Sequence, residues 1–270
     1  YAVTLSATDT YSRPYAGSES LDISIDPMFY LDSNGVTIKC KGCSAGDTGY
    51  IGNVLYTAHD NTSIADKSAS DTDWDRVVTT LVTDMSGLFQ DNSSFNQDIS
   101  SWDTSSVSNM QGLFQRAESF NQNIGDWDTS NVTDMRYMFK EAREFNNGDA
   151  SGVSSNTMNW DVSNVIFMNY MFQSALKFNQ DISPWDVSSV RSMSFMLSIA
   201  SSFNQDISGW CVPLISRPVD SFVTSSSPLY AVIDKLPNWG SCNSQATLNL
   251  TSSDSDNIIT SGVVTITGTF

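Results

Sequence analysis

A 25-residue repeat is the feature of this 270-residue sequence that most restricts its fold. A period of this length is typical of proteins built from stacked repeats, because a single repeat cannot bury its own apolar face. The repeat is clearest in a column of tryptophans that lie 25, 33, 25 and 25 residues apart, the long interval holding an insertion of eight residues that includes 147–152. The five members of this column are Trp102, Trp127, Trp160, Trp185 and Trp210.

Within each repeat the apolar spacing changes from a helical to an extended pattern. In the second repeat Val107, Met110, Phe114 and Ala117 follow at steps of 3, 4 and 3, which places them on one face of a helix. The next segment, Phe-Asn-Gln-Asp-Ile, predicts extended chain with turns. A period of 25 lies within the range of about 20–29 for leucine-rich repeats. We therefore predict an α/β solenoid of leucine-rich-repeat-like type over 81–210, with one short helix and one short strand per coil and a core of methionine and aromatic columns.

An asparagine follows the last aromatic residue of every repeat. A buried carboxamide at a tight corner can pair with backbone groups that would otherwise have no partner. The column predicts a structural asparagine ladder made of Asn96, Asn121, Asn146, Asn179 and Asn204.

The two ends of such a stack need covers, since terminal coils otherwise expose apolar edges. Residues 28–80 are expected to form the N-terminal cap, with β-strands at 35–40 and 50–58 and a helix within 68–84. The repeat fades over 211–245, which we expect to form a disulfide-tied C-terminal cap.

Four cysteines suit an oxidising compartment and predict two disulfides. The pairs Cys40–Cys43 and Cys211–Cys242 are favoured, because the members of each pair share a local segment. The alternatives for Cys40 and Cys43 are a redox motif or half of a zinc site. A redox motif needs a helix after the first cysteine, and a zinc site needs two more ligands in a chain whose single histidine is His59.

The chain is strongly acidic, with 13 Lys and Arg against 30 Asp and Glu and a formal net charge of -17. Such a surface repels nucleic acid and anionic lipid, so neither is expected as a partner. No segment reaches the roughly 20 apolar residues that cross a bilayer, and no membrane insertion is expected. The start at Tyr1 lacks Met and a charged region, which indicates a processed chain or a piece of a longer one.

The sequence contains no recognisable catalytic motif, and we expect no enzymatic activity. His59 has no nucleophile in a known triad pattern, and the phosphate-binding and dinucleotide-binding glycine motifs are absent. The repeated aspartates, such as Asp103 and Asp128, are expected to close turns. Calcium is the alternative for these residues and for Asp254 and Asp256, and no other cofactor is expected.

Four sequons, at Asn61, Asn92, Asn131 and Asn249, are candidates for N-glycosylation. They carry this meaning in a eukaryotic host and none in a bacterium. Asn92 stands where the other repeats have alanine, so we expect it to be more accessible than the rest of that column.

The repeat Phe-Asn-Gln-Asp-Ile-Ser-x-Trp-Asp-x-Ser-x-Val-x-x-Met resembles that of BspA-like bacterial surface proteins and lipoproteins, which also occur in marine microbes and algae. The resemblance covers about residues 34–242 and rests on five occurrences of the motif. It implies a cell-surface or secreted protein with a role in adhesion or assembly, and it brings no catalytic residues. Residues 1–27 and 246–270 resemble the last and the first strands of bacterial Ig-like repeats.

These observations predict an extracellular structural or adhesive protein, either a segment of a large surface protein or a subunit of a surface filament. Copies of the chain are expected to pair through the terminal strands in 1–27 and 246–270, because neither segment is long enough for an Ig-like sandwich. The alternative is a recognition module for surface glycans or proteins. No binding patch is expected, since the aromatic columns are assigned to the core and the variable positions are mostly Ser, Thr, Asn and Asp.

Overall fold

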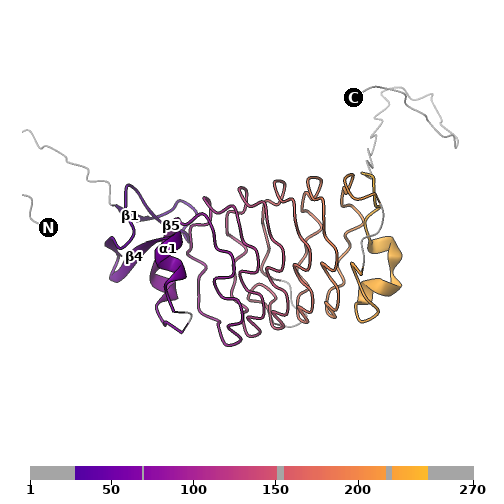
Figure 1. Ribbon diagram of the computed structural model, residues 1–270, viewed down its shortest axis with the longest axis horizontal. Coiled ribbons are helices and arrows are strands. Elements are labelled where there is room, and N and C mark those ends of the chain that lie inside the picture. The colour runs from indigo at the N-terminus through magenta and orange to yellow at the C-terminus, as the bar shows by residue number, and fades with distance from the viewer. Residues whose placement is uncertain (1–27, 69, 151–154, 217–220, 243–270) are drawn as a thin grey trace, which may run out of the picture.

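The computed structural model describes residues 28–68, 70–150, 155–216 and 221–242 (Figure 1). Within these ranges a row of coils lies between a strand-rich cap on the N-terminal side and a small cap on the C-terminal side. The Ig-like segments expected at 1–27 and 246–270 lie outside the described residues.

The coils stack in register on one another. We count them from the valine of each repeat, so that coils 1 to 5 begin at Val82, Val107, Val132, Val165 and Val190. Parallel backbone bridges join Asp84 to Asn109, Asn109 to Asp134, Asp134 to Phe167 and Phe167 to Ser192. The N–H groups of Met85, Gly87, Phe89 and Asp91 donate to carbonyls of coil 2 at 2.8–2.9 Å. Every second residue of this segment thus bonds to the next coil, as it would in a parallel sheet.

The first half of each coil is a chain of tight turns. The N–H groups of Leu88 and Gln90 donate to the carbonyl three residues earlier, whereas an α-helix uses the carbonyl four residues earlier. Gly87 and Asp91 lie in the left-handed region, at φ 65° and 64°, which a continuous right-handed helix excludes. The described residues of 82–216 contain no helix and no strand beyond single bridges, so the helix and strand predicted per coil are not observed there. Apolar residues that lie 3 and 4 positions apart can point into the core from successive turns as well as from one face of a helix, so this spacing does not distinguish the two.

Aromatic columns fill the centre of the stack. Phe114 stacks on Phe139 of the next coil with ring centroids 5.4 Å apart, and on Phe120 of its own coil at 3.9 Å. Each column tryptophan donates its indole N–H to a carbonyl of the preceding coil or cap, at 2.9–3.3 Å. Burial of the rings removes apolar surface from water, and these bonds keep the buried polar atoms paired. The core therefore fixes the register between coils.

The N-terminal cap holds the five strands and the one α-helix found among the described residues. The strands β1 (Phe29–Leu31) and β2 (Ile38–Cys40) are antiparallel, as are β3 (Thr48–Ile51) and β4 (Val54–Asp60), while β5 (Val77–Leu81) runs parallel to β4. The helix α1 (Asn61–Ala65) follows β4, and the 3-10 turn η1 (Trp74–Arg76) precedes β5. No helix in these ranges is long and apolar enough to span a membrane.

The helix expected within 68–84 is not present, since η1 and β5 occupy its second half. Val77, Val78 and Thr79 are β-branched, which favours a strand. Val77 packs into the core of the coils and Val78 into the smaller core of the cap, on opposite faces of β5. The need to fill two cores at once therefore overrides the helical spacing.

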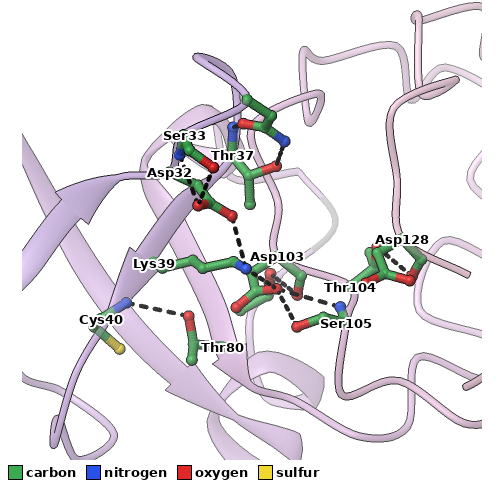
Figure 2. A network of polar contacts seen from close by, with 12 residues as sticks. Asp32, Ser33, Thr37, Lys39, Cys40, Thr80, Asp103, Thr104, Ser105 and Asp128 are labelled. Carbon is green, nitrogen blue, oxygen red and sulfur yellow. Dashed lines mark hydrogen bonds and ion pairs between the residues drawn. The ribbon is translucent and has the colours of Figure 1, made fainter. Parts of the chain in front are cut away.

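Lys39 links the cap to the coils (Figure 2). Its ammonium lies 2.8 Å from the Asp32 carboxylate and 4.0 Å from that of Asp103, which is buried. Asp103 also accepts from the Ser105 N–H at 3.2 Å and from its hydroxyl at 2.6 Å. The hydrogen bond to Asp32 raises the pKa of the Lys39 ammonium, which is therefore charged at neutral pH. This cation balances a carboxylate that is otherwise enclosed by the coil.

The C-terminal cap contains two 3-10 turns, η2 (Pro228–Ala231) and η3 (Ile233–Lys235). Its backbone continues the bonds between coils: the Leu197 N–H donates to the Phe222 carbonyl and the Ile207 N–H to that of Lys235, both at 3.0 Å. Disulfides join Cys211 to Cys242 here and Cys40 to Cys43 in the N-terminal cap.

Candidate functional site

The asparagines that follow each aromatic residue form a ladder along the stack. The carboxamide oxygen of each of the first four accepts from the backbone N–H of the asparagine in the next coil, at 2.7–2.9 Å. The glutamine that follows the ladder asparagine adds a second bond in three coils. Its side-chain N–H donates to the backbone carbonyl of the ladder asparagine one coil earlier, at 2.8–2.9 Å, from Gln122, Gln180 and Gln205. In the last coil the backbone carbonyl and the side-chain oxygen of Asn204 accept from the Lys235 ammonium, at 2.9 and 3.1 Å. These side chains bind one coil to the next.

Loss of one member of this ladder should be costly. The Asn121 side-chain oxygen accepts from the N–H groups of Asn146 and Gly148, at 2.7 and 3.0 Å. Asn121→Ala leaves both donors without this partner, and we expect the free energy of unfolding to fall by about 1–3 kcal/mol. Denaturant unfolding measures the change, with Ser119→Ala as a matched control because that side chain is exposed. Equal effects of the two substitutions would contradict the structural role of the ladder.

A row of three aromatic side chains lies along the tight turns of coils 3–5. Tyr137, Tyr170 and Phe195, here called the aromatic strip, are each partly exposed. The ring centroids of the two tyrosines are 5.1 Å apart at an interplanar angle of 15°, and those of Tyr170 and Phe195 are 4.8 Å apart at 4°. The same position in coils 1 and 2 is glycine, Gly87 and Gly112. The strip thus begins at coil 3, beside a coil that has no side chain at this position.

The backbone of this column is left-handed in all five coils. The φ angles are 65° and 63° at the two glycines, and 61°, 60° and 58° at Tyr137, Tyr170 and Phe195. A left-handed conformation costs a residue other than glycine roughly 1–2 kcal/mol. A stacked aromatic pair contributes about 0.5–1.5 kcal/mol beyond burial, so the two stacks offset only part of the strain of three residues. Bulky residues with this backbone are outliers, and outliers of this kind gather at functional sites.

Two cations border the aromatic strip, and both are paired. The Arg136 guanidinium donates to the Asp134 carboxylate from Nε at 3.0 Å and from Nη2 at 2.6 Å, and it lies 5.1 Å from the Phe167 ring centroid. The Lys140 ammonium lies 5.8 and 5.5 Å from the ring centroids of the two tyrosines and 3.9 Å from the Glu141 carboxylate. The border therefore presents cations that are already neutralised.

The aromatic strip lies outside the aromatic columns that were assigned to the core from the sequence, and its three rings are partly exposed. A signal for it is present in the sequence, two residues after the methionine of each repeat, where glycine changes to an aromatic residue from coil 3 onward. The residues four positions after the same methionines, four phenylalanines and Leu197, are buried in the core. The two columns differ in burial and in regularity, since the core column is apolar in every coil whereas the strip column is glycine in coils 1 and 2.

Two overlapping segments of the chain, 60–157 and 148–228, match a protein family described as "Mycoplasma protein of unknown function, DUF285". Together they span more than half of the chain and include all five coils. The chain belongs to the DUF285 family. No curated protein and no solved structure matches it. The two DUF285 matches overlap at 148–157, around the insertion of coil 3, so both the coils before it and those after it share the family pattern.

Two sequon asparagines in the DUF285 region use their amides within the fold. The Asn61 side-chain nitrogen donates to the Thr83 hydroxyl at 2.9 Å, and that of Asn131 donates to the Ser105 carbonyl at 2.7 Å. Asn92 is partly exposed, whereas the alanines of the same column are buried. A glycan on Asn61 or Asn131 would have to displace one of these bonds, although both residues are exposed and Asn92 is only partly so.

The aspartates repeated in the DUF285 coils serve the turns. The carboxylates of Asp128 and Asp161 accept from the hydroxyl of the serine two residues later, at 2.6 and 2.7 Å. Within the ranges that the structure describes, no group of three or more His, Cys, Asp or Glu side chains could hold a metal ion. The calcium candidates Asp254 and Asp256 and the sequon at Asn249 lie outside those ranges.

His59 is the single histidine of the chain and lies in β4. Its Nδ1 is buried and has no hydrogen-bond partner. Burial lowers the pKa of this imidazole, which is therefore neutral at pH 7. Its environment is that of a packed side chain in the cap.

Acid should remove a stabilising contact from the insertion of coil 3. The buried Asp149 carboxylate accepts from the N–H groups of Ser155 and Asn156 at 2.8 and 3.0 Å, and from the Gln180 amide at 3.1 Å. Burial raises the pKa of this carboxyl, but the hydrogen bonds outweigh it and hold the pKa below its usual value. A carboxyl group whose pKa is lower in the folded than in the unfolded chain stabilises the fold at pH values above its unfolded-state pKa, about 3.9 for Asp. That stabilisation is lost as the pH falls through the folded-state pKa.

We therefore expect the stability difference between the natural chain and Asp149→Asn to be largest near neutral pH and to shrink below about pH 4. Denaturant unfolding at a series of pH values measures the difference. Asp181→Asn is the matched control, because that carboxylate is exposed and accepts from the Ser183 N–H. A difference that does not change with pH would show that Asp149 contributes nothing as an anion.

Proposed function

We propose that the chain is a non-catalytic, extracellular repeat protein with a structural and adhesive role at a cell surface. Its coils would form a leucine-rich-repeat-like solenoid of BspA-like type, since the Phe-Asn-Gln-Asp-Ile motif carries that resemblance. Membership of the DUF285 family supports a repeat protein and assigns no activity.

The observation that carries this proposal is the continuous asparagine ladder. It fastens every coil to its neighbours, together with the backbone bridges and the indole bonds of the tryptophans. A body with this many bonds between its coils is expected to be stiff, which suits a structural element. The disulfides Cys40–Cys43 and Cys211–Cys242 lie in the two caps and favour an oxidising, extracellular compartment. The net charge of -17 favours solubility outside the cell.

Labelling of intact cells tests the location. An antibody raised against the described coils should stain unpermeabilised cells of the source organism, and brief external protease treatment should remove the stain. Staining that appears only after permeabilisation would contradict the proposal.

Self-association through 1–27 and 246–270 is part of the same proposal. The segment 263–266, Val-Val-Thr-Ile, is apolar and rich in β-branched residues, as pairing strands are. Sedimentation over a range of concentrations should show oligomers that disappear when 1–27 are deleted. A chain that sediments as a monomer throughout would refute this part alone.

The aromatic strip favours a second role, recognition of a ligand at the surface. Partly exposed rings on strained backbone are more than a structural body needs, because glycine already serves the same position in coils 1 and 2.

A further inference from the structure

We propose that residues 21–25 of this chain dock as an added strand on the open edge of β3 in the N-terminal cap. This contact lies within one molecule and is separate from the surface role and the association between copies proposed above. Three features support it: the edge that the cap leaves open, the exposed apolar side chains beside that edge, and the short length of chain that joins residues 21–25 to β1.

The strand β3 is the outer strand of its sheet. The strand order is β3-β4-β5, and the part of the chain that the structure describes places no strand on the outer side of β3. Alternate residues of an antiparallel edge strand direct their N–H and C=O groups away from the neighbouring strand. Such a row of groups is a template on which a further strand can pair.

The face of the sheet beside this edge is apolar and exposed. Tyr50 of β3 and Leu55 of β4 are opposite each other in the antiparallel register, so their side chains lie on one face. They are 68% and 41% exposed. The other face of β3 is covered, because the Phe29 ring occupies the space that a side chain at Gly49 would fill. A strand with apolar side chains beside Tyr50 would therefore cover the face that the cap leaves bare.

Residues 21–25 have the sequence pattern of a strand with one apolar face. Apolar and polar residues alternate in the order Leu21, Asp22, Ile23, Ser24 and Ile25. Alternation with a period of two is typical of a half-buried strand, and isoleucine, being β-branched, favours a strand. The apolar side chains can thus lie against the exposed face of β3 and β4, with the polar ones on the opposite face.

The chain between Ile25 and β1 keeps this segment close to β3. Ile25 precedes Phe29 by four positions, which span at most about 14 Å when fully extended. The Phe29 ring in turn lies against Gly49 of β3. Sheets that pack face to face are about 10 Å apart, so the connection is long enough to cross from β1 to the edge of β3. A tether of this length gives the segment a high effective concentration at that edge, which favours it over the same segment of another copy.

A second apolar segment, 263–266, starts farther from this edge. It follows Cys242, which lies in the C-terminal cap at the opposite end of the stack from β4 (Figure 1). The observations therefore favour residues 21–25 as the occupant.

Hydrogen exchange of the full chain tests the pairing. Neighbouring residues of a strand direct their N–H groups to opposite sides, so the double variant Ile23→Pro, Ser24→Pro removes a donor to β3 in either register. We expect the open-edge amides of β3, within Thr48–Ile51, to exchange at least about tenfold faster in this variant than in the natural chain. The amides of β5 should keep their protection, because β4 separates β5 from this edge.

The double variant Ser6→Pro, Ala7→Pro is the matched control, because it introduces two prolines outside 21–25. It should leave the exchange of β3 unchanged. Equal exchange of β3 in the natural chain and in Ile23→Pro, Ser24→Pro would overturn the proposal, as would an equal effect of the two double variants.

Photo-crosslinking identifies the segment that covers Tyr50. This residue is replaced by p-benzoylphenylalanine in the full chain, and isotope-labelled and unlabelled copies are mixed before irradiation. Crosslinks from position 50 should lead to residues 21–25, and only within copies of the same label. Crosslinks between differently labelled copies would assign the edge to a second molecule, and crosslinks to 263–266 would assign it to the C-terminal segment; either result overturns the proposal. Both measurements are separate from the labelling and sedimentation tests above, so either proposal can fail without the other.

Discussion

Replacing Trp127 by alanine should lower the free energy of unfolding by about 3–5 kcal/mol, the largest effect we expect from a single substitution. The side chain is 3% exposed. Its ring is parallel to that of Trp102, with ring centroids 6.1 Å apart, and its centroid lies 6.2 Å from that of the Phe114 ring. Its indole N–H donates to the Ile99 carbonyl at 3.2 Å. Alanine leaves a cavity between two coils and removes one of the two donors to the Ile99 carbonyl, the other being the Trp102 backbone N–H. Denaturant unfolding measures the loss.

Two variants separate the contributions. Trp127→Phe keeps an aromatic ring and removes the indole bond, so we expect a smaller loss of about 1–3 kcal/mol. Tyr230→Ala changes a side chain that is 62% exposed in η2 and should stay within about 0.5 kcal/mol of the natural chain. If Trp127→Ala behaves like Tyr230→Ala, the aromatic columns do not hold the coils together.

Removing the Cys211–Cys242 disulfide should cost about 3–4 kcal/mol in the chain-entropy model, because the bond closes a loop between residues 31 apart. The double variant Cys211→Ser, Cys242→Ser tests this by thermal or denaturant unfolding. Each coil is stabilised by its neighbours, so the loss should first appear as faster hydrogen exchange in coil 5. The N-terminal cap should keep its protection.

The second disulfide provides the comparison. Cys40 and Cys43 are 3 residues apart, so the same model assigns their bond a smaller contribution. The double variant Cys40→Ser, Cys43→Ser should therefore melt at a higher temperature than the C-terminal double variant. The opposite order would mean that the C-terminal cap is not held chiefly by its disulfide.

The parts of the structure that recur at a fixed step could be predicted from the sequence. Trp127, Phe114 and Asn121 each belong to a column of five, and repetition shows which positions face the same environment. The role of each column followed from its chemistry, apolar for the core and carboxamide for the ladder. The local conformation was less predictable, because turns and helices share the spacing of Val107, Met110 and Phe114.

The missed features are those that occur once or that change along the stack. The aromatic strip starts at Tyr137, after two coils with glycine, so it does not form a uniform column. The strand β5 is set by contacts of Val77 and Val78 with two separate cores, which no local pattern reveals. The partner of Asn204 is Lys235, which is 31 residues away and outside the repeat. Such contacts depend on which distant segments of the chain the fold brings together, and the spacing of residues along the sequence does not encode them.

A lysine of the C-terminal cap ends the asparagine ladder. Each asparagine of the ladder from Asn121 onward donates its backbone N–H to the coil before it and accepts with its side-chain oxygen from the coil or cap after it, whereas the Lys235 ammonium only donates and offers no acceptor. The ladder is therefore closed by one residue outside the repeat. Duplication of a 25-residue unit within the stack would leave both caps untouched and lengthen the molecule by roughly 5 Å per copy. Relatives with more or fewer units would differ in reach, with the same two ends.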